Sequence, residues 1–261
     1  MNQLTTLDAA FDLSGRTALV TGAGSGLGRQ FARVLARAGA KVALCARRAE
    51  KLEETAAMIA GDGGETLCVT LDVTDPDSVR DAVDTVVSRS GLPRILINNA
   101  GTNRPKFATD TTVEDWDAVL DTNLRGCFLM AKEIGSRLIE AKSTGSIVNI
   151  ASVLAVRTQK SVSAYMAAKG GLLQLSSSLA LEWARYGIRV NTLVPGYFNT
   201  EITEEFLQSG PGRKIVANIP FGRVGELEEL NGPILLLASD AGSFMTGSAL
   251  VADGGHLISS L

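Results

Sequence analysis

The sequence has very little of the residue type on which many hydrolases and dehydrogenases depend. It contains a single histidine, His256, among 261 residues. A Ser-His-Asp hydrolase, a zinc hydrolase with histidine ligands and a histidine-based dehydrogenase would each need a histidine in the active site. We expect His256 to lie on the surface. Chemistry on a hydroxyl or carbonyl group must then use another acid and base.

Cysteine is also scarce, and its spacing excludes two kinds of site. Cys45, Cys68 and Cys127 form no C-x-x-C pair, so neither a zinc site nor a disulfide framework is expected. Cys45 and Cys68 stand in apolar, strand-like runs and are predicted to be buried thiols. Reduced thiols fit a cytoplasmic protein, and no metal site is predicted.

The chain has no strong excess of charge and no long hydrophobic run. Its formal net charge is −3, which does not indicate a nucleic acid or an anionic membrane as a partner. No apolar segment approaches the roughly 20 residues that a membrane-spanning helix needs. Residues 1–13 lack the pattern of a signal peptide and are predicted to be a tail. With 45% hydrophobic and 20% charged residues, the chain should be globular.

What the chain does contain is a regular alternation of short apolar runs with helical patterns. Continuous apolar strands between helices are typical of a parallel sheet that is covered on both faces. We therefore predict an α/β fold, a doubly wound (Rossmann) parallel sheet of seven strands, in a single domain over residues 14–261. A segment at about 195–220 breaks the alternation and is predicted to be a substrate lid. The predicted strands are 17–20, 41–46, 66–71, 94–98, 145–151, 188–194 and 249–252.

One helical run carries a candidate acid–base pair. Tyr165 and Lys169 are four residues apart in an alanine-rich stretch that should be helical, so both side chains lie on one face. An ammonium group beside a phenol favours the phenolate and brings a group with an ordinary pKa of ~10 towards neutral pH. Ser152 follows an apolar strand, and its hydroxyl could reach a substrate oxygen near Tyr165. The alternative is an ordinary Tyr–Lys pair on a helix surface.

A glycine-rich turn at residues 21–28 joins the first strand to the first helix. Glycines let a backbone approach a diphosphate, and a helix N-terminus offers free N–H groups and a favourable dipole. The turn does not match G-x-G-x-x-G, because Leu27 stands at the sixth position, and it lacks the ending of a P-loop. Its place at the first strand–helix junction of a doubly wound pattern still favours a dinucleotide.

Together these motifs resemble those of the short-chain dehydrogenase/reductase family, in its short single-domain form, of the 3-oxoacyl reductase and gluconate dehydrogenase type. The resemblance extends over about residues 14–255, and several motifs in the family's order are more specific than any one of them. The residues that carry it are Thr21, Gly22, Gly26 and Gly28, Asn98-Asn99-Ala100-Gly101, Asn123, Ser152, Tyr165 and Lys169, Pro195-Gly196, and Thr200.

The resemblance implies a role for each of these residues. Tyr165 would be the acid/base, Ser152 would position the reacting oxygen, and Lys169 would bind the nicotinamide ribose and lower the pKa of the tyrosine. Asn123 would hold a water that relays protons, unless its amide only fixes a buried loop. Asp72 would contact adenine, unless it only caps the approach to a helix. The implied cofactor contacts are Gly22, Ser25, Gly26, Leu27, Gly28, Arg47, Arg48, Asp72, Val73, Asn99, Ala100, Gly101, Tyr165, Lys169, Pro195, Gly196, Phe198 and Thr200.

The end of the second strand bears on which dinucleotide is bound. In NAD enzymes an acidic residue about 20 positions beyond the glycines binds the ribose hydroxyls. Here Ala46 stands at that place, followed by Arg47 and Arg48. Guanidinium groups suit a phosphate, so NADP(H) is favoured and NAD(H) is the alternative. One of the two arginines could instead begin a solvated helix.

The sequence is less informative about the substrate, which we expect to be a small carbonyl compound or alcohol. The leading hypothesis is an NADP(H)-dependent oxidoreductase that moves a hydride between nicotinamide and a ketone or secondary alcohol. The alternatives are an NAD(H)-dependent sugar, sugar-acid or hydroxyacyl dehydrogenase of the same family, and a non-catalytic dinucleotide sensor. The implied substrate contacts are Ser152, Leu154, Tyr165, Tyr197 and Phe206, with Arg104 or Arg157 as candidates to hold an anionic group.

The resemblance also implies a homotetramer, because the family commonly pairs two long helices and the C-terminal strand across subunits. In this chain, leucines of the helix that carries Tyr165 are expected to supply the apolar surface for such contacts. They are Leu172, Leu173, Leu175 and Leu179.

Overall fold

A parallel sheet of seven strands forms the centre of the computed structural model, which describes residues 6–200 and 203–259. The strand order is β3-β2-β1-β4-β5-β6-β7. Every predicted strand is confirmed, with ends within one residue of the prediction. The strands are β1 (Thr17–Thr21), β2 (Lys41–Ala46), β3 (Thr66–Thr70), β4 (Pro93–Asn98), β5 (Gly145–Ile150), β6 (Ile188–Pro195) and β7 (Ala249–Ala252).

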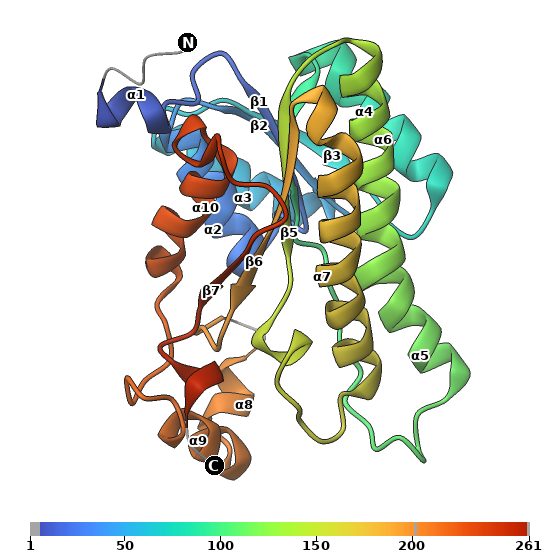
Figure 1. Cartoon of the computed structure of the whole chain (residues 1–261), viewed down its shortest axis with the longest axis vertical. Helices are drawn as coiled ribbons and strands as arrows, with labels where there is room; N and C mark the ends of the chain where they lie inside the picture. The colour runs from blue at the N-terminus through green and yellow to red at the C-terminus, as the bar shows by residue number, and fades with distance from the viewer. Residues whose placement is uncertain (1–5, 201–202, 260–261) are drawn as a thin grey trace.

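Helices cover both faces of this sheet, as the apolar strands require (Figure 1). One face is packed by α2 (Gly26–Arg37), α3 (Ala49–Gly61) and α10 (Asn231–Ala238). The other face is packed by α4 (Pro76–Ser90), α6 (Gly126–Glu140) and α7 (Ser163–Trp183). The remaining elements are α5 (Val113–Leu120), the π-helical turn η1 (Asp121–Arg125), the 3₁₀ turns η2 (Val153–Ala155), η3 (Ala184–Tyr186), η4 (Leu227–Leu230), η5 (Asp240–Gly242) and η6 (His256–Ile258), and α8 (Glu204–Gln208) and α9 (Gly210–Ala217).

Strands β1 to β6 each contribute side chains to two separate hydrophobic clusters, whereas β7 contributes only to the cluster under α2. In β1, Ala18 and Val20 pack under α2, whereas Leu19 points to the opposite face, where α6 lies. This follows from the alternation of side chains along a strand, which has a period of two residues. Both faces are fully buried here, so the sequence of β1 is apolar throughout.

The N-terminal segment differs from the predicted tail. Residues Leu7–Phe11 form a short helix, α1, and the Thr6 hydroxyl caps it by accepting a hydrogen bond of 3.2 Å from the N–H of Ala9. Leu13 is completely buried in the core cluster under α2. The described part of this segment therefore packs as part of the domain.

The sheet provides a crevice where its strand order reverses. β1 neighbours both β2 and β4, so the connections leave its carboxyl end in opposite directions, which is where doubly wound folds bind ligands. The segment after β6 carries α8 and α9 and lies at the opposite end of the molecule from α1 (Figure 1). Residues 201–202 of the predicted lid lie outside the described residues.

Candidate active site at the carboxyl ends of the strands

The glycine turn after β1 and the loop after β4 are joined at the crevice. The Thr21 hydroxyl accepts hydrogen bonds of 3.0 Å from the N–H groups of Asn99 and Ala100. The Asn99 amide donates in return to the Thr21 carbonyl, also at 3.0 Å. A Cβ on Gly22 would lie 2.9 Å from the Asn99 amide nitrogen, and one on Gly28 would lie 2.5 Å from it. The two loops thus approach more closely than side chains would permit.

The N-terminus of α2 opens towards this crevice with its first N–H groups uncapped. Ser25 is the N-cap residue, and among the described residues its hydroxyl makes no capping hydrogen bond. Gly26 adopts a positive φ of 50°, which favours glycine, and the Thr200 side chain lies 3.7 Å from the place of a Cβ there. Free N–H groups at a helix N-terminus fit the diphosphate of a dinucleotide. The residues present therefore fit the cofactor that the sequence predicted.

The adenosine end of such a cofactor would lie beside the ends of β2 and β3. Arg47 and Arg48 are exposed there, and Arg48 is the N-cap residue of α3. Asp72 accepts hydrogen bonds of 2.9 and 2.8 Å from the N–H and hydroxyl of Thr74. Burial acts to raise the pKa of Asp72, but these bonds and the nearby Arg47 outweigh it, so the pKa is lowered. Asp72 and Arg47 are thus neighbours on this side of the crevice.

Two of the implied cofactor contacts, Val73 and Phe198, have buried side chains. Val73 is 7% exposed and packs under Gly126 of α6. Phe198 is 6% exposed, and its ring lies against Gly225 in the core cluster under α2. These two side chains are therefore not available for contact with a cofactor. Val73 and Phe198 can contact it only through their backbone atoms. Asp72 does not cap α4 either, because Asp75 does.

Tyr165, Lys169 and Ser152 meet where β5 and α7 pack together. Lys169 is only 3% exposed, and its ammonium group donates to the Ile150 carbonyl at 2.7 Å and lies 5.6 Å from the centre of the Tyr165 ring. Tyr165 packs against a cluster that contains Ala151, Leu154 and other buried residues. Ser152 is the N-cap residue of η2, which packs against α7, and its hydroxyl accepts a 3.2 Å hydrogen bond from the Leu154 N–H. The structure thus brings together residues that are 17 positions apart in sequence.

Asn123 lies in the π-helical turn between α5 and α6 and is completely buried. Its amide nitrogen donates to the carbonyls of Thr102 at 2.7 Å and Val119 at 2.8 Å, and its amide oxygen accepts from the Thr102 N–H at 3.3 Å. The side chain therefore fixes the loop after β4, which was the alternative function considered from the sequence. π-helical turns often occur at functional sites.

Tyr197, one of the residues expected to contact the substrate, is held by two neighbouring side chains. Its hydroxyl donates to Oε1 of Gln159 at 2.6 Å, and its ring lies 5.6 Å from the ring of His256. Burial, with a further contribution from Tyr165, raises the pKa of Tyr197 to about 12, although Arg157 acts in the opposite direction. Tyr197 is therefore a neutral hydroxyl at physiological pH.

The surface position predicted for His256 is wrong. The residue is only 5% exposed, because the C-terminal segment folds back over the loop after β5. Burial and the neighbouring Arg157 lower the pKa of His256, and Asp253 opposes them. The histidine is therefore predominantly neutral at pH 7.

Both candidate anion-holding arginines have partners within the protein. Arg104 forms an ion pair of 3.0 Å with Asp115. Arg157 donates through Nη1 to the carbonyl of His256 and, at 2.8 Å, to the hydroxyl of Ser259. Arg157 therefore fastens the C-terminal segment in place.

Two of the other residues expected to contact the substrate differ in exposure. Phe206, on α8, is 37% exposed, whereas Leu154 is 9% exposed.

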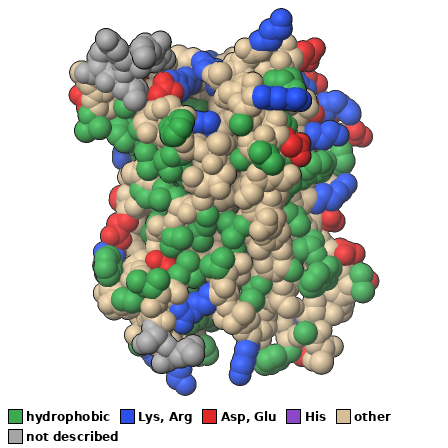
Figure 2. All heavy atoms as spheres, in the orientation of Figure 1, with side chains coloured by type: hydrophobic (Ala, Val, Ile, Leu, Met, Phe, Trp, Pro, Cys, Tyr) green, Lys and Arg blue, Asp and Glu red, His purple; other side chains and the backbone are tan. Residues whose placement is uncertain are grey.

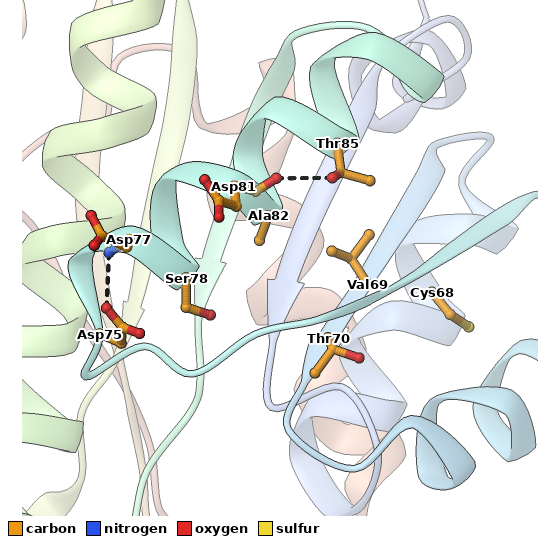
Figure 3. Close-up of a pocket in the computed structure, with 9 residues that line it drawn as sticks. All are labelled: Cys68, Val69, Thr70, Asp75, Asp77, Ser78, Asp81, Ala82 and Thr85. Atoms are coloured by element: carbon orange, nitrogen blue, oxygen red, sulfur yellow. Dashed lines mark hydrogen bonds between the residues drawn. The ribbon is translucent and has the colours of Figure 1, made fainter.

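A separate hollow of about 560 Å³ lies beside the edge strand β3 and shares no residue with this site (Figure 3). Three carboxylates of α4 and the turn before it, Asp75, Asp77 and Asp81, line it together with Cys68. Cys68 is half-buried, unlike the fully buried Cys45. Among the described residues, no group of three or more His, Cys, Asp or Glu could hold a metal ion.

Comparison with known proteins places this geometry in a family. A family model described as Enoyl-(Acyl carrier protein) reductase matches residues 22–256. A short-chain type dehydrogenase/reductase from Mycobacterium marinum has a crystal structure that matches with a TM-score of 0.90 and 38% identity, over 95% of this chain and 97% of that one. The chain belongs to the short-chain dehydrogenase/reductase family. The predicted class of enzyme is thereby confirmed.

Two further relatives of this short-chain dehydrogenase/reductase carry more specific names. The Gluconate 5-dehydrogenase of Gluconobacter oxydans (strain 621H) is 38% identical over 250 residues, which cover 95% of this chain and 97% of the relative. The crystal structure of a gluconate 5-dehydrogenase from Burkholderia cenocepacia J2315 in complex with NADP and tartrate matches with a TM-score of 0.93 and 35% identity. It covers 98% of this chain and 100% of that one.

Several residues that shape the site of this family member had no signal in the sequence analysis. Arg29 donates to the Gly24 carbonyl at 2.6 Å and to the Thr55 hydroxyl at 3.1 Å, which fixes the glycine turn. Gln159 and the buried His256 hold the Tyr197 side chain, the first through a hydrogen bond and the second through a ring contact. None of these belongs to a local motif, so their contacts could be found only from the fold.

Within the described part of the chain, no helix is long and apolar enough to cross a membrane.

Proposed function

We propose that this protein is an NADP(H)-dependent oxidoreductase that transfers a hydride between nicotinamide and a ketone or secondary alcohol, with Tyr165 as the acid/base. In the reducing direction, the phenol donates its proton to the carbonyl oxygen as the hydride reaches the carbonyl carbon. In the oxidising direction, the tyrosine oxygen removes the proton from the hydroxyl. Nicotinamide supplies or accepts the hydride when it is bound.

The observation that carries this proposal is the burial of Lys169 beside Tyr165. Its side chain is 3% exposed, and in the described part of the chain no carboxylate pairs with it. A buried ammonium group without a counter-ion is unfavourable for folding, which suggests that the charge serves the chemistry. The distance of 5.6 Å between this ammonium group and the centre of the Tyr165 ring supports a role for Lys169 in stabilising negative charge on the tyrosine oxygen.

Ser152 and the π-helical turn have supporting functions in this proposal. The Ser152 hydroxyl can donate a hydrogen bond to the substrate oxygen while it accepts one from the Leu154 N–H. The side chain of Asn123 is already hydrogen-bonded to the loop after β4, so a proton-relaying water would be held by its backbone. The hydrogen bonds of the amide keep that backbone in place.

The residues that would hold the cofactor favour NADP(H) over NAD(H). The N–H groups at the start of α2 bind the diphosphate, and Lys169 also binds the nicotinamide ribose. At the end of β2, Ala46 leaves space for a 2′-phosphate, and the exposed Arg47 can pair with it. The NADP complex of the Burkholderia cenocepacia relative supports this choice. The NAD(H)-dependent alternative requires that Arg47 extend into solvent.

The names of the relatives support a polyhydroxylated substrate. Gluconate carries several hydroxyl groups and a carboxylate, and the tartrate in the Burkholderia cenocepacia structure does so as well. Neither Arg104 nor Arg157 is a strong candidate to hold a carboxylate, because both bond within the protein. We therefore propose recognition through hydroxyl groups, rather than through an anionic group.

We also propose that the protein is a cytoplasmic homotetramer. Two of the four leucines expected at the interface, Leu172 and Leu179, are in fact buried in the core of the single chain. Other apolar side chains are exposed on the same side, such as Leu181 of α7 at 83% and Phe128 of α6 at 40%. Hydrophobic side chains also gather near the edge strand β7, where Val251 is 44% exposed (Figure 2). Sedimentation that showed only a 27.4 kDa species at micromolar concentration would contradict the tetramer.

Initial rates with a panel of ketones and alcohols test the function directly. We expect the change in NADPH absorbance to depend on the carbonyl substrate, with slower turnover when NADH replaces NADPH. Tight binding of NADPH without turnover of any member of the panel would instead favour the dinucleotide sensor.

A further inference from the structure

Two polar side chains near Tyr165, those of Gln159 and Tyr197, have no part in the hydride transfer itself. Gln159 lies in the loop after η2, and its backbone N–H is 3.4 Å from the sulfur of Met166, the residue next to Tyr165. Tyr197 follows β6, and its hydroxyl is 2.6 Å from Oε1 of Gln159. Two loops that follow neighbouring strands thus place an amide and a phenol side by side at the edge of the catalytic group.

The hydrogen bond between these two side chains determines which atoms remain available. The Tyr197 phenol has one proton, and it is donated to Oε1 of Gln159. The phenol oxygen then retains lone pairs as an acceptor, and the NH₂ group of Gln159 remains as a donor. Among the described residues, no hydrogen bond occupies that NH₂ group. A donor and an acceptor side by side match two neighbouring hydroxyl groups of one molecule.

The environment of Tyr197 keeps it in the protonated form that this arrangement needs. Burial raises its pKa to about 12 and outweighs the nearby Arg157, which acts to lower it. Tyr197 therefore stays a neutral phenol whose proton is donated to Gln159.

The C-terminal segment supports Tyr197 from behind. The His256 ring packs at a centroid distance of 5.6 Å and a tilt of 39°. Arg157 donates to the carbonyl of His256 and holds this segment against the loop that carries Gln159. Leu257 packs into the same cluster as Tyr165, which places the segment at the site.

We propose that Gln159 and Tyr197 form a specificity pair that recognises adjacent hydroxyl groups of a polyhydroxylated substrate, with His256 as the residue that positions Tyr197. This inference rests on the proposed function, because it concerns substrate selection at the same site. The substrate class is a polyol or sugar acid whose reacting carbon is flanked by hydroxyl-bearing carbons.

D-threitol and 2-butanol provide a matched pair of probes, because they share a four-carbon chain and differ only in their hydroxyl groups. We would measure kcat and KM for both with saturating NADP⁺, in the unmutated protein and in Tyr197→Phe and Gln159→Leu. Each variant should lower the ratio of kcat/KM for D-threitol to that for 2-butanol by up to about tenfold, as expected for one lost hydrogen bond. The loss should appear mainly as a higher KM for D-threitol.

The double variant tests whether Gln159 and Tyr197 act as a pair or independently. The His256 variants test whether His256 positions Tyr197. Because each member orients the other, Tyr197→Phe with Gln159→Leu should lower the ratio by less than the product of the single effects. His256→Leu should lower it through loss of the ring contact, and His256→Phe, which keeps an aromatic ring, should restore it. Thermal unfolding of each variant checks that the fold is intact.

The outcomes distinguish this inference from the function on which it rests. If the unmutated protein oxidises no alcohol and reduces no ketone, the proposed function is wrong. If it oxidises 2-butanol but not D-threitol, or if the ratio is unchanged in both single variants, the function stands and the specificity pair is wrong. If His256→Phe behaves like His256→Leu, the positioning role is wrong.

Discussion

The proposed cofactor half and the proposed substrate half of the site lie at the same edge of the sheet but are built from different groups. In the cofactor half, around the glycine turn, the important groups belong to the backbone, and side chains are excluded because Gly22 and Gly28 lie against Asn99. In the substrate half, around Tyr165, the important groups are side chains, such as Lys169 and Tyr197, that reach across from different elements.

The difference has a physical reason. A diphosphate is the same in every dinucleotide and can be bound by backbone N–H groups at a helix N-terminus. Such groups do not depend on particular side chains. Proton transfer and substrate selection need particular side chains in particular environments. We therefore expect substitutions in the two halves to separate binding from chemistry, and the following predictions test that separation in order of decreasing effect.

Replacement of Tyr165 by Phe should have the largest effect. It removes the proton donor and should lower kcat by about 10²–10⁴-fold, the range typical of general acid–base groups. NADPH should still bind, because the N–H groups of α2 are untouched. Steady-state kinetics and fluorescence titration with NADPH measure the two effects. Near-normal turnover of any accepted substrate would exclude Tyr165 as the acid/base.

Replacement of Gly28 by Ala should weaken binding of the cofactor, which the Tyr165 variant leaves intact. The new Cβ would overlap the Gly22 carbonyl and lie 2.5 Å from the Asn99 amide nitrogen, so the backbone of the turn must shift. We expect weaker NADPH binding and a loss of about 1–3 kcal/mol in the free energy of unfolding, as is usual for overpacking. Urea unfolding and NADPH titration measure both.

A matched glycine provides the control for this substitution. Gly61 is at the end of α3, and a Cβ there meets nothing within 4 Å. Gly61→Ala should leave NADPH binding unchanged and the stability equal or slightly higher. Equal losses in the two variants would mean that the close approach at Gly28 is not the cause.

The third prediction concerns the cofactor preference, at the outer edge of the cofactor half. Ala46→Asp with Arg47→Ile should weaken NADPH by about one to two decades in affinity, because a charge-assisted contact is lost and a carboxylate is placed near the phosphate. NADH should improve, because the carboxylate can accept both ribose hydroxyls. Kinetics with both cofactors at low ionic strength measure the change. A preference of the unmutated protein for NADH would show that Arg47 does not bind the phosphate.

The smallest expected effect is a pH dependence that arises in the substrate half. The pKa of His256 is lowered from an ordinary value of 6.5, chiefly by burial, so the folded protein binds fewer protons there than the unfolded chain. This contribution to stability is present above pH 6.5 and is lost as the pH falls towards the folded-state pKa. The unfolding temperature should therefore decrease less on acidification in His256→Gln than in the unmutated protein. Parallel curves for the two proteins would contradict this.

The strands and the glycine motifs of the proposed cofactor half could be predicted from the sequence because their signals are local. The turn from Thr21 to Gly28 and the loop from Asn98 to Gly101 are short contiguous motifs, and their glycines are required by close approach. The strands were predicted within one residue, because strands buried on both faces are continuous apolar runs. The individual cofactor contacts stay predictions, and burial of the Phe198 and Val73 side chains leaves these two residues only their backbone for such contacts.

The substrate half was harder to predict because its side chains are far apart in the sequence. Gln159, Tyr197 and His256 come from three separate segments, and no spacing within any one of them indicates that they meet. The burial of His256 depends on the return of the C-terminal segment over the loop after β5. The Ser259 partner of Arg157 likewise comes from a distant segment, 102 residues away, whereas the Asp115 partner of Arg104 is only 11 residues away.

The sequence by itself determined the order of strands and helices and the glycine turn, and it predicts Ser152, Tyr165 and Lys169 as a catalytic set, because hydrophobic periodicity and short motifs are local properties. Only the tertiary structure decided which of the polar groups face one another. Burial and hydrogen-bond partners depend on contacts between distant segments, and these decide that Lys169 is buried beside Tyr165 while Tyr197 pairs with Gln159. The environment of a side chain, and so its chemistry, is set by the packing of the whole chain.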